Sequence, residues 1–254
     1  MGQAARPGFG RTLRLRWSAQ PTLRQLRLGS GLVLFAYVLT HLLCHALGNI
    51  SLDALETGLA VKVALWRTPP ALLLLYGALL IHLALGLQAF YERRFYRVRP
   101  AETAQLLLGL AVPVLLLSHV VGTRLAWSVE ELDRGYAQVL YATWVAAPGH
   151  GLMLAVGLVV AWLHGCFGLY FWLRLKRGFA RAAPWLLAGA VLVPVLALLG
   201  VVQGGRSVAA LAADPAWRTQ ELGPNHLGLA EQTERLGAIR RGLFLAYMAL
   251  LALV

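Results

Sequence analysis

The chain has 254 residues, of which 59% are hydrophobic and 13% are charged, and its formal net charge is +12. The apolar share is above that of an average soluble domain, and several apolar runs reach the roughly 20 residues that a helix needs to cross a bilayer. Composition therefore excludes an ordinary soluble domain. The positive charge is interpreted as a signal for membrane orientation, and no nucleic-acid partner is expected.

Six apolar segments predict an all-α integral membrane protein with six transmembrane helices. The predicted spans lie at about 28–50, 70–91, 104–126, 149–173, 183–203 and 237–254, within a membrane domain over 28–254. Residues 1–27 form a polar segment that is too long and too basic for a cleaved secretory leader. We expect this segment to stay in the cytoplasm and the first span to remain as an anchor.

The basic residues are distributed unevenly over the predicted loops. With the N-terminus inside, 14 of the 23 basic residues but only two of the 11 acidic residues fall on the inner side. Lys and Arg favour the cytoplasmic side, so this bias predicts an N-in protein of the inner (plasma) membrane, with both termini cytoplasmic. The last helix stops at Val254 without a flanking charge, and we expect a cytoplasmic domain to follow.

Five of the seven histidines fall inside the predicted spans, where ionisable side chains usually mark function. His82 and His164 each lie ten residues, or about 15 Å of helix, from the inner charged flank. His41, His45 and His119 lie deeper, at about 21, 27 and 25 Å from that flank. The histidines therefore form an inner layer of two and an outer layer of three.

Histidines at equal depth on different helices suit the two axial positions of a haem iron. Small residues that follow several of them would leave room for a porphyrin: Gly48, Gly86, Gly122, Thr123, Gly165 and Gly168. A zinc or copper site would need three or more ligands at one level, and a proton-coupled transporter would need deep acidic residues, which the spans lack. The simpler alternative is that each histidine only hydrogen-bonds a neighbouring helix.

The anionic propionates of such haems would need cationic or polar partners near the membrane faces. Arg124, five residues beyond His119, is predicted to serve the outer haem, and Arg93 or Arg174 the inner one. A quinone site is also expected near an interface. Its candidate residues are His45 with Trp127, or Arg240 with Arg241.

Four segments resemble the dihaem cytochrome b anchor of quinol:fumarate reductases. They are SGLVLFAYVLTH (30–41), LLIHLALGLQAFYERR (79–94), LLLSHVVGTR (115–124) and WLHGCFGLYFWLRLK (162–176). In that family four helices each supply one axial histidine, so the resemblance implies two haem b groups within a bundle of the first four spans. The implied ligand pairs are His41 with His119 for the outer haem and His82 with His164 for the inner haem. His45 is then a propionate partner or part of a quinone site.

The chain also departs from that family, whose anchor has five spans and no ligand on the third. Here four consecutive spans carry the ligands and two more follow, which more closely resembles the six-helix membrane domain of certain bacterial class III adenylate/guanylate cyclases. This resemblance covers most of residues 20–204 and implies a homodimeric redox or quinone sensor. Its signal would pass to a cytoplasmic iron–sulfur or cyclase domain. Nothing in the chain resembles a cyclase active site, so no catalytic residue is predicted.

Other functions stay open at this point. The chain could be the cytochrome b subunit of a succinate/fumarate:quinone oxidoreductase, which flavin and iron–sulfur partners would reveal. It could be a transmembrane oxidoreductase of the ferric-reductase or b561 kind, which ascorbate- or NADPH-driven reduction would reveal. A haem-free membrane receptor or scaffold is the remaining alternative.

Overall fold

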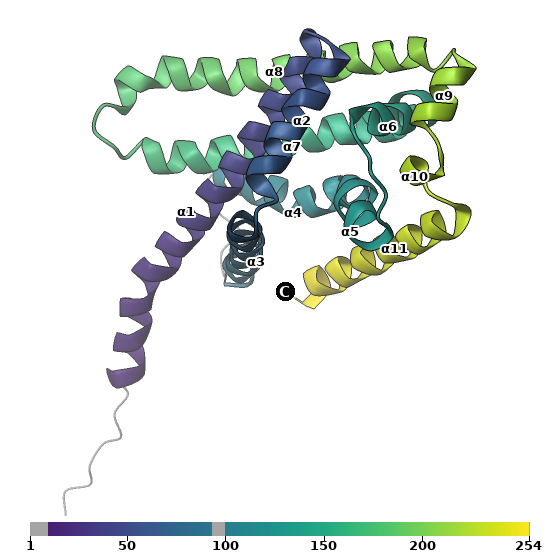
Figure 1. Ribbon diagram of the computed structural model, residues 1–254. Coiled ribbons are helices and arrows are strands. Elements are labelled where there is room, and N and C mark those ends of the chain that lie inside the picture. Colours follow the sequence, from purple (N-terminus) through teal and green to yellow (C-terminus); the bar gives the residue numbers. More distant parts are fainter. Residues whose placement is uncertain (1–9, 93–99, 254) are drawn as a thin grey trace, which may run out of the picture.

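The computed structural model describes residues 10–92 and 100–253, with side chains from Thr22 onward. All regular elements in those ranges are helices (Figure 1). Six helical segments among them are long and apolar enough to cross a membrane, which confirms the predicted number of spans. They run over Thr22–Asn49, Pro69–Tyr91, Pro100–Glu130, Pro148–Leu173, Phe179–Leu211 and Pro224–Leu253.

Each span is built on one long helix, since a helix satisfies its own backbone hydrogen bonds where water is absent. In chain order these helices are α1 (Gly10–Ala46), α3 (Pro69–Tyr91), α4 (Pro100–Val120), α7 (Pro148–Leu173), α8 (Phe179–Leu211) and α11 (Ala230–Leu253). A proline begins α3, α4 and α7, at the position where no intrahelical N–H is needed. The predicted interior prolines, Pro113 and Pro194, lie within α4 and α8.

Two spans contain a turn whose hydrogen-bonding pattern differs from that of an α-helix. A 3₁₀ turn, η1 (Leu47–Asn49), follows α1. The third span continues from α4 through a π-helical turn, η2 (Val121–Leu125), into the short helix α5 (Ala126–Glu130). Such π turns hold one residue more than α-helical turns and occur often at functional sites.

Shorter helices occupy the connections between spans. They are α2 (Leu52–Trp66), α6 (Tyr136–Leu140), η3 (Tyr141–Ala146), α9 (Pro215–Glu221) and α10 (Pro224–Leu227). Leu55 of α2, Tyr136 and Leu140 of α6, and Val208 of α8 form one buried cluster, against which Trp217 of α9 packs. The connections after the first, third and fifth spans therefore gather at one end of the molecule, as a chain that crosses a membrane six times requires.

The first four spans are arranged as two helix pairs. α1 packs along α3 and α4 packs along α7, whereas backbone contacts between these two pairs are sparse. α1 also packs along α8, and α2 lies back along the C-terminal half of α1 (Figure 1). The close crossing of α1 and α8 uses Gly48, whose backbone lies against Gly200. Gly48, expected to leave room for a porphyrin, instead makes room for α8.

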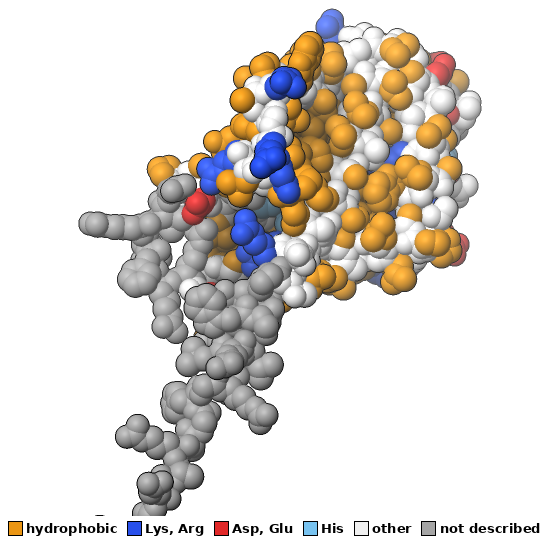
Figure 2. Space-filling model, turned by 90° about the vertical axis from the view of Figure 1, so that its left-hand side faces the viewer, with side chains coloured by type: hydrophobic (Ala, Val, Ile, Leu, Met, Phe, Trp, Pro, Cys, Tyr) orange, Lys and Arg blue, Asp and Glu red, His pale blue; other side chains and the backbone are white. Residues whose placement is uncertain are grey.

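The outer surface of the molecule is largely apolar. Hydrophobic side chains are spread over the coloured part of the face shown in Figure 2, and Lys and Arg side chains occur there in a few separate clusters. Many large aliphatic side chains of the spans are exposed, among them Leu73, Leu80, Leu152 and Leu187. Exposing such an apolar surface to water would be unfavourable, so these helices are expected to lie in a lipid bilayer.

Candidate functional site

His82 of α3 and His164 of α7 face one another across the two helix pairs, with ring centroids 6.0 Å apart. His164 Nδ1 donates to the carbonyl of Gln105 at 2.8 Å, and His82 Nδ1 lies 3.3 Å from the carbonyl of Arg27. A carbonyl oxygen can only accept, so Nδ1 of His164 carries the ring proton. His82 Nδ1 also lies 3.3 Å from the Ser30 hydroxyl, which itself donates to the Arg27 carbonyl, so His82 Nδ1 donates to one of these two oxygens. Each Nε2 then has a free lone pair, which is the state in which histidine binds a metal.

Two glycines on neighbouring helices make room for these rings. A Cβ atom on Gly31 of α1 would lie 3.0 Å from His82 Cε1, and one on Gly109 of α4 would lie 2.6 Å from His164 Cε1. Sequence reasoning placed the space-making glycines on the ligand helices themselves. Of these, Gly165 faces Phe35 of α1, and Gly86 has no heavy atom within 4 Å of the position its Cβ would take.

His41 of α1 and His119 of α4 form the second pair, with ring centroids 5.7 Å apart. His119 Nδ1 is buried and has no hydrogen-bond partner among the described residues. A buried imidazole nitrogen without a partner is costly, and ligand binding through the ring would offset that cost. His119 is also the second-last residue of α4, so the π turn begins directly beyond its neighbour Val120.

His45 lies beside His41, one helical turn along α1, with ring centroids 4.4 Å apart. Its Nδ1 lies 3.0 Å from the hydroxyl of Tyr136, which can accept a hydrogen bond from the ring N–H. His41 Nδ1 instead lies 2.8 Å from Nζ of Lys62 in α2. Burial lowers the pKa of Lys62 to about 8, so at neutral pH its ammonium donates and the His41 proton sits on Nε2. Ring separation therefore favours His41 as the partner of His119, whereas hydrogen bonding favours His45.

The separations within the two pairs fit metal ligation by opposed rings. A metal–imidazole bond is about 2 Å long, so rings on opposite sides of one metal ion have centroids about 6 Å apart. The observed 5.7 and 6.0 Å match that value. No group of three or more His, Cys, Asp or Glu that could hold a metal ion occurs among the described residues. A pair of histidines supplies fewer protein ligands than the four of a structural zinc site.

The predicted propionate partners lie at the ends of the spans. Arg124, in the π turn, donates from Nε to the Tyr76 hydroxyl at 2.7 Å, and its Nη1 is buried without a partner among the described residues. Arg174, which caps the C-terminal end of α7, packs over Phe171 and has a buried Nε without a partner there. Arg93 lies outside the described residues. Both described arginines thus retain an unused donor.

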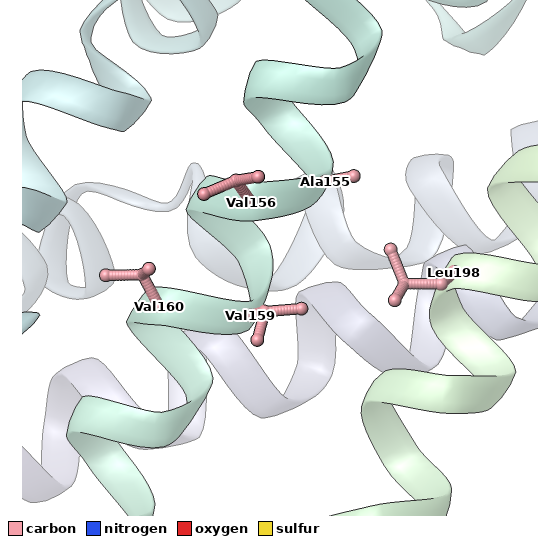
Figure 3. Close-up of a pocket in the computed structure, with 5 residues that line it drawn as sticks. All are labelled: Ala155, Val156, Val159, Val160 and Leu198. Atoms are coloured by element: carbon pink, nitrogen blue, oxygen red, sulfur yellow. The ribbon is translucent and has the colours of Figure 1, made fainter.

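The candidate quinone residues have different contacts among the described residues. His45 contacts His41 and Tyr136, whereas the ring of Trp127 lies under the guanidinium groups of Arg67 and Arg124. Arg240 and Arg241 are exposed on α11. A groove between α7 and α8 is lined by aliphatic side chains and carries no polar group that would orient a quinone head: Ala155, Val156, Val159, Val160 and Leu198 (Figure 3).

Sequence reasoning missed the contribution of α2, which was treated as part of a loop. Lys62 reaches His41, and Arg67 caps the end of α2 beside Trp127. A signal for this helix was present: Ser51 precedes an apolar run as an N-cap residue, and Asp53 lies in the first turn. Ser51 indeed accepts a hydrogen bond from the Ala54 N–H at 3.0 Å.

Comparison of the chain with protein-family models, with curated proteins and with solved structures finds no match.

Proposed function

We propose that this chain is a dihaem b-type membrane domain, in which His41 with His119 and His82 with His164 supply the axial ligands. One observation carries the proposal. Two histidine pairs lie at two levels, each bridging the α1–α3 and α4–α7 helix pairs, with ring separations of 5.7 and 6.0 Å. A structural role for isolated histidines does not require this repeated pairing.

The chain's own residues would orient and protect the cofactors. A bound haem supplies a centre that accepts and releases one electron. Hydrogen bonds from Nδ1 hold His82 and His164 with Nε2 directed away from the acceptor, which fixes ligand orientation. The apolar helices around both pairs exclude water and so preserve a low local dielectric, in which a change of charge is felt strongly.

The biological role that fits this arrangement is passage of electrons or a redox signal across the inner membrane. Its source would be the quinone pool, and its receiver an attached cytoplasmic iron–sulfur or cyclase domain. The resemblance to cyclase membrane domains supports this role, with a homodimer as the working unit and the N-terminus in the cytoplasm. The structure favours no particular rival, and the cytochrome b subunit of a succinate/fumarate:quinone oxidoreductase remains the main alternative.

Haem stoichiometry tests the proposal. The full chain, produced with haem supplied and purified in detergent, should show two haem b per chain by pyridine haemochrome and a dithionite-minus-oxidised spectrum. His82→Ala or His164→Ala should remove one haem, and His41→Ala or His119→Ala the other. The exposed His150→Ala serves as the matched control and should keep both. A chain without a Soret band would refute the proposal.

Two further experiments test which histidine of α1 is the ligand and what biological role the chain has. Loss of the second haem in His45→Ala but not in His41→Ala would reassign the ligand on α1. For the role, the full-length protein reconstituted with quinol and quinone should change its cyclase activity with the quinol fraction, and the His82→Ala variant should respond less. Co-purification with flavin and iron–sulfur subunits would instead favour the respiratory alternative.

A further inference from the structure

Two arginines from different elements lie over one aromatic ring, Trp127, at the end of the molecule that carries α2. Arg67 at the end of α2 places its guanidinium carbon 4.3 Å from the centroid of Trp127. Arg124 in the π turn places its own at 4.9 Å. The Tyr76 hydroxyl of α3 accepts from Arg124 Nε and so holds that side chain in place.

This cluster of positive charge has no acidic partner. All 11 acidic side chains belong to the described residues, and among the described basic residues only Arg235 forms ion pairs with them within 4 Å. Burial lowers the pKa of Arg67, and the positive charge of Arg124 lowers this pKa further, whereas Asp133 acts in the opposite direction without forming an ion pair with Arg67. An aromatic face compensates such charges only in part. An anion would complete the cluster.

A second observation points to where the anion would bind. Arg124 Nη1 is buried and has no hydrogen-bond partner among the described residues, so an oriented donor is left unused. No hydrogen bond of the described residues uses the Arg67 guanidinium either. Trp127 is 40% exposed, so the cluster opens towards the surface. Guanidinium groups match the paired oxygens of carboxylate and phosphate, and tryptophan favours the headgroup level of a membrane.

We propose that Arg67, Arg124 and Trp127 form a binding site for an oxyanion, a carboxylate or a phosphate. Two sources share this chemistry. One is a haem propionate near the His41/His119 pair, which rests on the proposed function. The other is the phosphate of an anionic lipid headgroup at the membrane surface, which does not. In both cases the two arginines donate to the oxygens, and Trp127 lies against both guanidinium groups.

The first arm of the test uses the chain prepared without haem, in mixed micelles. Phosphatidylglycerol should raise the thermal midpoint and change tryptophan emission relative to phosphatidylcholine, and titration gives the apparent affinity. Arg67→Gln and Arg124→Gln should each weaken binding about tenfold, the loss expected for one charge-assisted hydrogen bond. Trp127→Phe should remove the emission change. Arg218→Gln, on the exposed face of α9, is the matched control and should behave as wild type.

The second arm uses the haem-loaded chain and follows the midpoint potential and retention of each haem. An effect of Arg67→Gln and Arg124→Gln on one haem only, without lipid discrimination in the first arm, assigns the oxyanion to a propionate. Lipid discrimination that these variants abolish assigns it to a headgroup. If both arginine variants match wild type in lipid binding and, where haem is bound, in haem retention and potential, the proposed oxyanion site is wrong. A chain that binds no haem refutes the proposed function, and the first arm alone then decides the oxyanion site.

Discussion

At the residue scale, the histidines and the side chains that fix them are the decisive features. The sequence could place five histidines at two depths, because helical rise converts residue count into depth. It could not reveal which atoms hold each ring. His164 is held by a carbonyl of α4 and His41 by a lysine of α2, and both partners depend on packing between helices. The division of roles between His41 and His45 depends on such contacts.

Gly109 is a position in the histidine site at which an added methyl group should be poorly tolerated. Its Cβ would lie 2.6 Å from His164 Cε1, and that ring cannot move away without breaking its bond to Gln105. Gly109→Ala should therefore destabilise the protein by about 1–3 kcal/mol and remove the haem held by His82 and His164. Thermal unfolding in detergent and haem counting check this. Gly77→Ala, where no heavy atom lies within 4 Å of the Cβ position, should leave both unchanged.

Lys62 places a positive charge directly beside His41. Because a nearby cation disfavours the more positive, oxidised state of a haem, Lys62→Met should lower the midpoint potential of the haem held by this pair by tens of millivolts. Potentiometric titration at pH 7, where the Lys62 ammonium is largely charged, measures the shift. The haem held by His82 and His164 should keep its potential, and Lys176→Met is the control for a surface lysine. If both midpoint potentials stay unchanged in Lys62→Met, the assignment of His41, beside Lys62, as a haem ligand is contradicted.

At the element scale, the sequence predicted the six spans because long apolar runs are a strong signal. It did not predict α2, α6 or the π turn. Their patterns are short, and their stability comes from packing against the ends of the spans, as in the cluster of Leu55, Tyr136 and Val208. Short elements of this kind follow tertiary contacts more than local propensity.

Arg134 fastens several of these short elements to one another. Its guanidinium donates to the carbonyls of Gly122 in the π turn and of His226 and Leu227 in α10, at 2.7–2.8 Å. Arg134→Met should leave three carbonyls without their donor and cost about 2–4 kcal/mol of stability. The thermal midpoint should fall, and hydrogen exchange should rise over 121–125 and 224–227. Arg218→Met, which removes an exposed charge, should change neither quantity. Equal effects of Arg134→Met and Arg218→Met would contradict a stabilising role for the Arg134 hydrogen bonds.

At the scale of the whole molecule, the connections between spans lie where a chain that crosses the membrane back and forth should place them. The segments after the first, third and fifth spans gather at one end, where α2, α6 and α9 pack together. The sequence could predict this from the number of spans. Which side of the membrane this end faces depends on the distribution of Lys and Arg alone.

The orientation of the chain in the membrane can be tested by cysteine labelling. In a background of Cys44→Ala and Cys166→Ala, which removes the two free cysteines, Arg218→Cys should react with a membrane-impermeant maleimide in intact cells. Arg24→Cys should react only after the cells are lysed, because it lies in the segment expected inside. The reverse pattern would invert the orientation and, with it, the side on which a cyclase domain could be attached.

The π turn over Val121–Leu125 also bears on how the length of this chain can vary. Such a turn arises when one residue is inserted into an α-helix, and removing one residue there restores regular pitch. Elsewhere in the third span, a deletion would rotate everything beyond it by about 100°. Among relatives, length differences in this span should therefore fall between His119 and Trp127. A relative one residue shorter there should keep the orientation of the residues on both sides of the turn.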